Sequence, residues 1–496
     1  MISRKDVKCV KAYLGIDLGT TNLKAALYDG ELRPLGSESR PVDYVRENGF
    51  VEFDADAYVE GLYDVLRTLL ARLEIREISA MALTGQAETL ILLDRSLRPV
   101  GRAISWMDER SQAECAELSR EFPAEAVEEV TGQLSMLPTW PATKLLWLKK
   151  NRPADFDRAH RFVLLKDYVV YRLTGRLLAD MSIATFSLWF DIYRKRYWPE
   201  MLAYLGIDEN RLAEMTEPCS VAGGLLEDAA ERIGIRPGAP VSIGTLDHFA
   251  GMIGTGATRP GSLTLSTGTV MALAAVSAEP APRKSGIAMH YGFRPDTHVM
   301  LPVVESGGVS LEWFRNSCLC GMDYAELNEA LARRAPSGIL FLPNIVGTNA
   351  PAFDADATGV FWGLRQRHDA VDMARAVMEG VSFVLRENCE ALSAGGAPVE
   401  RIIATGGGAK SPIWCQMHAD ATGVPVSVPA EKDAACLGAA VIAAVADGRF
   451  RSFEDAAAAC IRIERTYRPG ASMDEKYRRF RRLYRAALQV GREEGN

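Results

Sequence analysis

The first chemically suggestive segment is Asp17-Leu18-Gly19-Thr20-Thr21-Asn22, a polar turn between two apolar runs. Glycine lets a backbone approach an anion closely, and hydroxyl and successive N–H groups donate hydrogen bonds to phosphate oxygens. A carboxylate such as that of Asp17 is suited to holding a magnesium ion through water. The turn therefore predicts a phosphate site with Thr20, Thr21 and Asn22 as donors. A plain β-hairpin turn is the alternative.

A second Gly- and Thr-rich turn, Ser266-Thr267-Gly268-Thr269, follows an apolar run near the middle of the chain. We expect Thr267, Gly268 and Thr269 to offer phosphate the same donors, although such hairpins are also common as plain turns. Each turn opens a strand–turn–strand unit followed by a long α/β stretch, which indicates duplicated halves. Two facing halves would bring the turns to opposite sides of one cleft.

The third segment, residues 405–412, reads TGGGAKSP and leads from a strand into a helix. Ser411 is predicted as the N-cap and Pro412 as the first helical residue. Consecutive glycines leave a flat surface for a base and ribose, so Gly407, Gly408 and Ser411 are predicted to contact a nucleotide. A flexible loop is the alternative, but the ordered strand and capped helix disfavour it. The Walker and GxGxxG patterns are absent from the sequence, which disfavours P-loop and Rossmann sites.

The acid–base candidate is Asp247, which follows an apolar strand at the expected start of a helix. A carboxylate aimed into a cleft can take the proton from an attacking hydroxyl, and phosphoryl transfer needs little more than metal, phosphate cradle and base. Its alternative role is a helix N-cap. His248 could bond a substrate hydroxyl, although a lone histidine is more often structural.

Substrate groups are expected from the first half of the chain, where carboxylates, amides and aromatic faces suit a polyhydroxyl ligand. The candidates after two predicted strands are Gln86, Glu88, Trp106 and Asp108, together with Asp247 and His248. Five of the eight tryptophans fall between residues 106 and 198, and most of these are expected in the core.

Short apolar strands bounded by turn residues must position these groups. They are predicted at 12–17, 23–28, 78–84, 241–244, 262–266, 270–275 and 402–405. Apolar residues spaced at helical intervals from Ala374 to Leu385 predict an amphipathic helix, and residues 474–490 predict a basic terminal helix with a solvated Arg-rich face.

The composition is that of a globular enzyme, with 496 residues, 48% of them hydrophobic and 24% charged, enough for two or three domains. A net charge of −7 disfavours a protein that coats nucleic acid. The nine scattered cysteines, Cys9 among them, favour reduced thiols. The N-terminus has no long apolar stretch and the run 437–446 is about half a membrane span, so we expect a cytoplasmic protein without nucleic-acid or membrane partners.

Together these motifs resemble the FGGY family of carbohydrate kinases, within the actin-like ATPase superfamily, from about Tyr13 to about Gly448. GIDLGTTNLKAALYD and STGT resemble its two phosphate motifs. Residues 144–151 and 359–379 resemble its two signatures, and residues 405–426 resemble its adenosine motif. The resemblance implies an α/β fold of two ribonuclease-H-like domains flanking a central cleft. Residues 12–256 would bind the sugar and residues 257–490 the ATP.

The resemblance also implies roles for individual residues, with ATP and Mg²⁺ as cofactors. Asp247 would be the general base and Asp17 would help to hold magnesium. Thr20, Thr267 and Gly268 would contact phosphates. The adenosine would lie against Gly407, Gly408 and Ser411. Cleft closure on sugar binding would exclude water.

The sequence departs from familiar members at the expected sugar pocket. Xylulokinases usually carry Met-His, and glycerol kinases Arg-Glu, where this chain has Ala87-Glu88. His248 stands where glycerol kinases have Gln and xylulokinases usually Asn, and Leu246 replaces the usual Gly. The missing Arg at Ala87 leaves space, which suits a longer polyol or a ketose.

The predicted function is therefore an ATP-dependent kinase that phosphorylates a primary hydroxyl of a small-molecule ketose or sugar alcohol. The alternatives are a catalytically silent sugar-responsive regulator on the same fold and a glycerol or tetritol kinase. A chaperone-type ATPase also shares GIDLGTTN, but the chain leaves no separate peptide-binding domain. The oligomeric state stays open, with a homodimer as one option.

Overall fold

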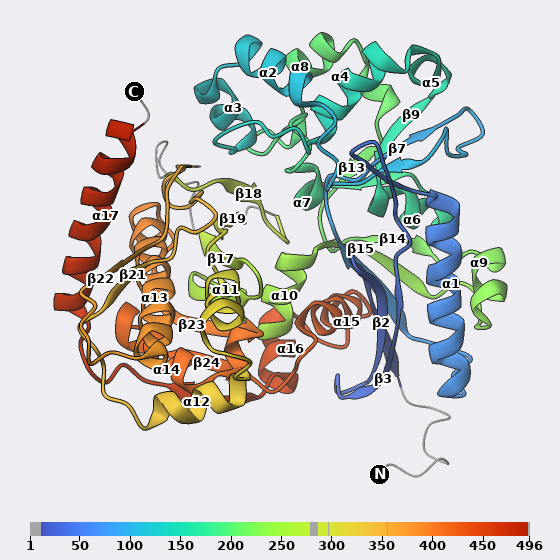
Figure 1. Ribbon diagram of the computed structural model, residues 1–496. Coiled ribbons are helices and arrows are strands. Elements are labelled where there is room, and N and C mark those ends of the chain that lie inside the picture. Colours follow the sequence, from blue (N-terminus) through green and yellow to red (C-terminus); the bar gives the residue numbers. More distant parts are fainter. Residues whose placement is uncertain (1–10, 278–285, 296, 355, 495–496) are drawn as a thin grey trace. The chain divides into compact units, whose positions relative to one another are not determined.

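The computed structural model describes residues 11–277, 286–295, 297–354 and 356–494, which form two compact units (Figure 1). The first unit contains the described residues up to Thr258, together with Met289–His298 and Asp433–Ile461. The second unit takes the remaining described residues. The predicted mixed α/β architecture of two parts is confirmed. The units are discontinuous along the chain, and a domain boundary at 256/257 stays a prediction.

The first unit is built on a six-stranded sheet in the order β14-β15-β6-β1-β2-β3. Its strands are β1 (Ala12–Leu18), β2 (Asn22–Asp29), β3 (Pro34–Pro41), β6 (Ala80–Gly85), β14 (Val221–Gly224) and β15 (Pro240–Leu246). β1, β2 and β3 are antiparallel neighbours, whereas β1, β6 and β15 run parallel. The strands predicted near 12–17, 23–28, 78–84 and 241–244 are thus neighbours in one sheet.

Helices cover both faces of this sheet. Figure 1 shows α1 (Ala55–Arg72) along β2 and β3 on one side and α15 (Ala434–Ala446) on the other. α1 begins at Asp54, whose side chain accepts the N–H of Ala57 at 2.8 Å and so caps the helix. The apolar run 437–446 is therefore a buried core helix. No helix in the described part of the chain is long and apolar enough to cross a membrane.

A second, five-stranded sheet in the order β4-β5-β8-β7-β9 combines two strands that precede β6 with three that follow it. Its strands are β4 (Val45–Glu47), β5 (Phe50–Phe53), β7 (Leu90–Leu93), β8 (Ala103–Ile104) and β9 (Arg161–Leu164). The helices of this unit after α1 are α2 (Gln112–Glu121), α3 (Ala124–Thr131), α4 (Pro141–Asn151), α5 (Pro153–Arg158), α6 (Leu165–Thr174), α7 (Met181–Ala184), α8 (Pro199–Leu205), α9 (Glu227–Ile233), α10 (Asp247–Thr255), α15 and α16 (Phe453–Cys460). Short strand pairs are β10 (Leu178–Asp180) with β13 (Glu214–Thr216) and β11 (Phe190–Asp191) with β12 (Arg196–Tyr197).

The sheet of the second unit repeats the plan of the first. β16 (Gly261–Thr267) and β17 (Met271–Ser277) form an antiparallel hairpin, and β23 (Val399–Gly406) and β24 (Val426–Pro429) follow parallel to β16. β25 (Ile463–Tyr467) closes this edge. A hairpin followed by two parallel strands is the pattern that β1, β2, β6 and β15 make in the first unit.

Helices α13 (Ala370–Ala394) and α14 (Pro412–Thr422) pack together beside this sheet. The helix predicted around Ala374–Leu385 is α13, and the predicted basic terminal helix is α17 (Asp474–Glu494), which buries Tyr477 and Phe480 against Phe383. The other elements of this unit are α11 (Gly308–Cys318), α12 (Tyr324–Ala332), β20 (Val303–Val304), β21 (Leu340–Leu342) and β22 (Val360–Trp362). β18 (Met289–Tyr291) and β19 (His298–Met300) lie where the chain passes between units.

The eight cysteines in the described ranges are all free thiols. Cys9 lies outside these ranges.

Glycines allow α10 and α15 to approach each other at backbone distance. A Cβ built at Gly438 would lie 1.8 Å from the carbonyl oxygen of Ala250, and one at Gly254 would lie 2.0 Å from that of Ala434. Because atoms cannot approach so closely, both positions require glycine. Helix α15 therefore packs against both α10, which begins at Asp247, and the six-stranded sheet.

We predict that Gly438→Ala destabilises the first unit, because the new methyl group must push the two helices apart. Such overpacking costs about 1–3 kcal/mol, which should lower Tm by about 5 °C in scanning calorimetry. The matched control is Gly251→Ala on α10, where an added Cβ meets nothing within 4 Å among the described residues. The control should hold or raise Tm, since alanine favours helix over glycine. Equal losses in both variants would contradict the packing argument.

Candidate active site

The register of three parallel strands brings the predicted acidic residues to one edge of the first sheet. Asp17 in β1 lies opposite Thr84 in β6, and Thr84 lies opposite Thr245 in β15. Asp247 follows Thr245 by two residues and is the first residue of α10. Because carboxyl ends of parallel strands meet at one edge, Asp17 and Asp247 belong to the same local site.

The surroundings of Asp17 disfavour the charged form of its carboxyl group. Burial raises the pKa of its carboxyl group, and together with the nearby carboxylates of Asp247 and Asp433 it brings this pKa to about 8. Lys24, its cross-strand neighbour in β2, opposes this shift but also pairs with Asp433. The buried Oδ1 of Asp17 has no hydrogen-bond partner among the described residues. This excess of negative charge suits a divalent cation.

The described residues contain no cluster of three or more His, Cys, Asp or Glu side chains arranged to ligate a metal directly. Magnesium usually keeps several waters and takes only one or two protein carboxylates, along with substrate phosphates. Asp17 therefore fits a magnesium ion held largely through water. Asp433, which precedes α15, was not anticipated as part of this site, and an acidic residue just before an apolar helix was its only signal in the sequence.

Asp247 is half-buried, and its carboxylate is oriented by the helix that it starts. Its Oδ1 accepts the backbone N–H of His248 at 2.6 Å, whereas the N-cap residue of α10 is Leu246. The alternative role of Asp247 as an N-cap is therefore not what the structure shows. The His248 side chain is exposed at the same helix start.

A bulge in β15 changes the direction of the chain just before Asp247. Gly244 has a φ of +68°, and a Cβ there would lie 1.5 Å from the carbonyl oxygen of Leu83. The register against β6 shifts between Ser242 and Thr245. Bulges re-aim side chains at the ends of strands, and this one immediately precedes Asp247.

A buried polar chain holds the junction between β15 and α10 from behind. Lys166 pairs with Asp180, and both side chains are fully buried. The hydroxyl of Ser182 donates to the carboxylate of Asp180, at 2.8–2.9 Å from its two oxygens. The Oγ of Ser182 lies 2.8 Å from the Oγ1 of Thr245 and accepts the N–H of Leu246 at 3.3 Å. This chain fixes the two residues that precede Asp247, and no sequence pattern had pointed to it.

The structure gives Gln86 and Trp106 contacts with the phosphate turn. The Gln86 amide donates to the carbonyl oxygen of Gly19 at 3.3 Å. The indole N–H of Trp106 donates to the Oγ1 of Thr20 at 2.8 Å. Thr21 is exposed in the same turn, and so is Asn22, the first residue of β2. Candidates for the sugar and for the phosphate thus lie together.

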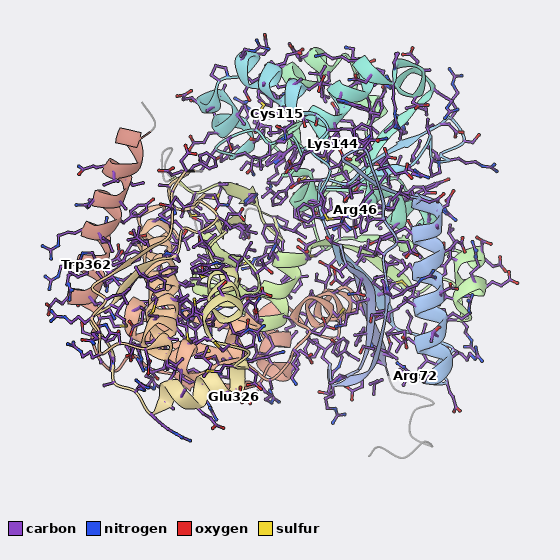
Figure 2. All side chains as sticks on the ribbon, viewed as in Figure 1. Arg46, Arg72, Cys115, Lys144, Glu326 and Trp362 are labelled. Atoms are coloured by element: carbon purple, nitrogen blue, oxygen red, sulfur yellow. The ribbon has the colours of Figure 1, made fainter. Side chains whose placement is uncertain are left out.

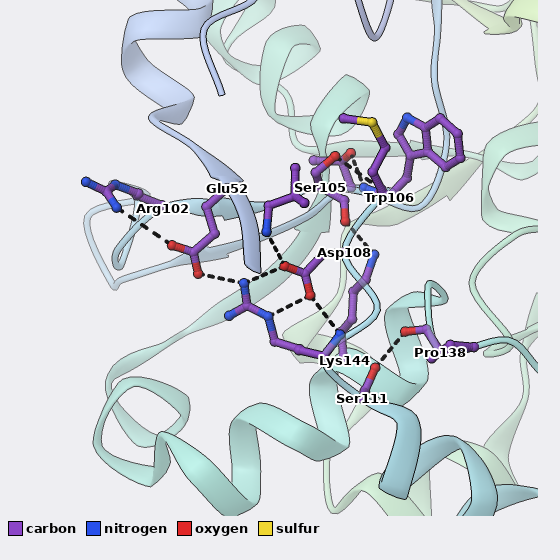
Figure 3. A network of polar contacts seen from close by, with 12 residues as sticks. Glu52, Arg102, Ser105, Trp106, Asp108, Ser111, Pro138 and Lys144 are labelled. Atoms are coloured by element: carbon purple, nitrogen blue, oxygen red, sulfur yellow. Dashed lines mark hydrogen bonds and ion pairs between the residues drawn. The ribbon is translucent and has the colours of Figure 1, made fainter. Parts of the chain in front are cut away.

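Asp108 is fully buried inside its own loop (Figure 3). Its carboxylate accepts the N–H of Val51 at 2.6 Å and two side-chain N–H groups of Arg110, each at 2.7 Å. These bonds hold the pKa of Asp108 below its usual value although burial opposes ionisation. The guanidinium of Arg110 lies 3.9 Å from the ring centre of Phe50 and 4.9 Å from that of Trp147. Asp108 therefore fixes the loop that carries Trp106, and its direct contact with sugar stays a prediction.

Glu88 is held in a left-handed backbone conformation, with a φ of +65°. Non-glycine residues adopt this conformation at a cost, often at functional sites. Its buried Oε2 has no hydrogen-bond partner in the described ranges, and burial raises its pKa to about 7. Lys144 on α4, labelled in Figure 2, lies nearby, and burial lowers its pKa to about 8. The Lys144 ammonium donates to the carbonyl oxygen of Ser105 at 2.8 Å.

The second unit gathers the predicted nucleotide residues around a cavity of about 460 Å³. The predicted residues that line it are Thr267, Gly268, Thr269, Gly407, Gly408 and Ser411. Apolar side chains that sequence reasoning missed, including Leu311, Met378 and Trp414, complete the lining. The cavity therefore joins the second turn to the glycine-rich segment, as a nucleotide site requires.

Local geometry explains the glycines and the serine of this cavity. Thr267 lies opposite Gly406 in the parallel ladder, and a Cβ at Gly408 would lie 2.7 Å from the Cβ of Thr267. Ser411 accepts the N–H of Trp414 at 3.2 Å, which confirms it as the N-cap of α14, and Pro412 is the first helical residue. The flat backbone surface predicted for residues 405–412 is thus a consequence of close strand packing.

Comparisons with known proteins agree with this geometry. Models of the N-terminal and C-terminal domains of the FGGY family of carbohydrate kinases match residues 12–254 and 263–446. A xylulose kinase of Klebsiella pneumoniae is 32% identical over 442 residues, which cover 88% of this chain and 90% of that protein. A gluconokinase of Bacillus licheniformis is 26% identical over 485 residues, 95% of this chain and 94% of that protein. A crystal structure described as a xyloylose kinase from Brucella ovis, 31% identical, aligns with a TM-score of 0.90 over 97% of this chain and all of that one.

The fold and the two sites define an ATP-dependent sugar kinase, which transfers phosphate from ATP to a small-molecule sugar. The chain belongs to the FGGY family of carbohydrate kinases.

We predict that Ser182→Ala lowers kcat by roughly 10- to 100-fold with little change in KM for ATP, because the residues preceding Asp247 lose their buried anchor. The matched control is Ser187→Ala, since Ser187 is equally buried but its hydroxyl bonds to Ala184 and Trp189 of its own segment. Steady-state kinetics on folded protein, checked by circular dichroism, measure the difference. Equal kcat values for the two variants would contradict a positioning role for Ser182.

Proposed function

We propose that the protein transfers the γ-phosphoryl group of ATP to a primary hydroxyl of a ketose or sugar alcohol, with Asp247 as general base. The observation that carries this proposal is the strand register that brings Asp17 and Asp247 to one sheet edge. A base and a metal-holding carboxylate side by side are the minimum that phosphoryl transfer requires.

In this mechanism the Asp247 carboxylate accepts the proton of the attacking hydroxyl as the oxygen forms its bond to the γ-phosphorus. The bond from the γ-phosphorus to the bridging oxygen breaks, and ADP leaves with the electron pair. The N–H of His248 and the Ser182 chain keep the carboxylate in position throughout.

The phosphates are assigned to backbone and hydroxyl donors of each turn, and the metal to the Asp17 carboxylate. Magnesium, when bound, neutralises charge developing on the transferred group. Asp17 would hold this ion, which also relieves the repulsion around its carboxylate. The proposed phosphate donors are Thr20, Thr21, Asn22, Thr267, Gly268 and Thr269. The adenosine is assigned to the cavity at Gly407, Gly408 and Ser411.

The acidic surroundings favour a neutral sugar over a sugar acid. The carboxyl groups of Asp17, Asp247 and Glu88 lie on the proposed sugar side and would repel an anionic ligand once ionised, while the Lys144 ammonium is turned into backbone carbonyls. Ala87 leaves the space that an arginine side chain would fill. The substrate class proposed is therefore a pentulose, a hexulose or a polyol, bound by Gln86, Glu88, Trp106, Asp247 and His248. Gluconate, a carboxylate, should be rejected.

The test is ADP release with ATP and magnesium against pentuloses, hexuloses, tetritols, pentitols, glycerol and gluconate. One neutral sugar should dominate. Asp247→Asn, which keeps size and polarity but removes the base, should lower kcat for that sugar by about 10²–10⁴-fold. Full activity in this variant would overturn the assigned base. Preference for gluconate would overturn the neutral-sugar assignment while leaving the kinase class intact.

We further predict that metal–nucleotide binding releases a proton from Asp17. Since the pKa of the free carboxyl is about 8, it is protonated below that pH and must ionise to hold the ion. Affinity for magnesium β,γ-imido-ATP should therefore be about tenfold weaker at pH 7 than at pH 9. Calorimetry in buffers of different ionisation enthalpy measures this release. Asp17→Asn leaves only the nucleotide's own protons, so an unchanged release in that variant would contradict the prediction.

A further inference from the structure

Hydrogen bonds join the phosphate turn and two sugar-side segments in a closed circuit within the first unit. The backbone N–H of Trp106 donates to the Oγ1 of Thr89 at 3.2 Å, and the Thr89 hydroxyl donates to the Oε1 of Gln86 at 2.8 Å. The Gln86 amide donates to the carbonyl oxygen of Gly19 at 3.3 Å. The indole of Trp106 then closes the circuit on Thr20 at 2.8 Å.

The chemistry of these groups sets the direction of the last bond. An indole N–H can only donate, so the Oγ1 of Thr20 must accept it. The hydroxyl proton of Thr20 is therefore directed to another acceptor, and a phosphate oxygen is the acceptor that the turn is proposed to meet. The indole of Trp106 thereby orients the donor that Thr20 offers to phosphate.

The members of the circuit are buried or hydrogen-bonded from behind, except for the exposed Trp106. The hydroxyl of Tyr44 donates to the carbonyl oxygen of Thr20 at 3.1 Å, and that of Tyr58 reaches the carbonyl oxygen of Gly19 at 3.4 Å. Gln86 and Thr89 are buried, whereas 38% of the surface of Trp106 is exposed. A ligand on the sugar side can therefore act on the circuit through the indole.

We propose that Trp106 couples sugar binding to phosphate binding, as a positioning residue for Thr20. This inference rests on the proposed function, which gives Thr20 to phosphate and Trp106 to the sugar. When sugar packs on the indole and immobilises it, Thr20 keeps its proton directed at phosphate and the nucleotide binds more tightly. By linkage, nucleotide must tighten sugar binding by the same factor.

The test measures the affinity of magnesium β,γ-imido-ATP by calorimetry, with and without a mixture of the neutral sugars named above. Sugar should tighten nucleotide binding about five- to twentyfold in the unmodified protein. The coupling ratio is the nucleotide affinity with sugar divided by the affinity without it. In Trp106→Phe, which keeps an aromatic face but removes the N–H, this ratio should fall to about two or less. The matched control is Trp198→Phe, because Trp198 is buried against Phe122 away from the circuit. It should keep the full ratio.

A second pair of variants covers the case in which Trp106→Phe folds poorly. Thr20→Ser keeps the hydroxyl and should keep the coupling, whereas Thr20→Val removes the hydroxyl and should abolish it. The proposal is overturned if sugar leaves nucleotide affinity unchanged in the unmodified protein, or if Trp106→Phe or Thr20→Val retains the full ratio. It is also overturned if Trp198→Phe loses the ratio equally.

Asp247→Asn separates this inference from the function on which it rests. Asp247 is also a proposed sugar contact, so Asp247→Asn can need more sugar for saturation. Coupling is an equilibrium property, so at saturating sugar this variant should lose turnover and keep the ratio of nucleotide affinities with and without sugar. Turnover that survives in Asp247→Asn while Trp106→Phe loses coupling would overturn the assigned base and support the circuit. If turnover is lost in Asp247→Asn and coupling stays intact in Trp106→Phe, the assigned base is supported and the role of the circuit is overturned.

Discussion

The lateral register of β1, β6 and β15 is the constraint on which the first site depends. Backbones lie so close at this edge that a Cβ at Gly85 would sit 2.5 Å from the Cβ of Leu18. At Gly244 a Cβ would collide with the backbone of Leu83, so no other residue type fits there. A slip of one residue would turn every side chain to the opposite face. A slip of β1 against β6 would therefore turn the Asp17 side chain away from the strand end that leads into Asp247. The closeness of the two carboxyl groups is therefore a consequence of strand pairing.

Several groups at the same edge of the sheet destabilise the fold. Asp17 is held among carboxylates, Glu88 keeps a left-handed backbone, and buried oxygens of both side chains lack partners in the described ranges. Such features destabilise a fold and persist only where surrounding structure overrides them. The surrounding structure here is apolar, with α1 on one face of the sheet and α15 on the other. Ordinary core packing thus supplies the stability that offsets these unfavourable features.

Much of the fold could be predicted from the sequence, because its strands are short apolar runs punctuated by turns and its helices have local signals. Ser411 and Pro412 marked the start of α14, and helical spacing marked α13. Local patterns could not separate Asp108 from Asp247, since both follow apolar strands. Only the tertiary structure shows that Arg110, from the same loop, donates two hydrogen bonds to the Asp108 carboxylate. Asp247 instead begins a helix at the edge of the sheet.

Contacts between distant segments were beyond such reasoning. Asp433 reaches Asp17 across more than four hundred residues, and Ser182 reaches Leu246 across sixty-four. Nothing in the local pattern of either segment names its partner, because tertiary packing alone creates the pair. The two Gly- and Thr-rich turns (residues 17–22 and 266–269) and the glycine-rich segment (residues 405–412) were recognisable because each is one short stretch of chain.

The discontinuity of the first unit also determines when that unit can be completed during synthesis. Its sheet is finished by β15, yet α15, which covers one face of that sheet, is supplied by Asp433–Ile461. A ribosome must therefore translate almost two hundred further residues while the apolar surface beneath α15 waits uncovered. Such exposed surface invites aggregation and chaperone binding in nascent chains. Production of this enzyme should accordingly be more sensitive to chaperone supply and growth temperature than the stability of its finished fold suggests.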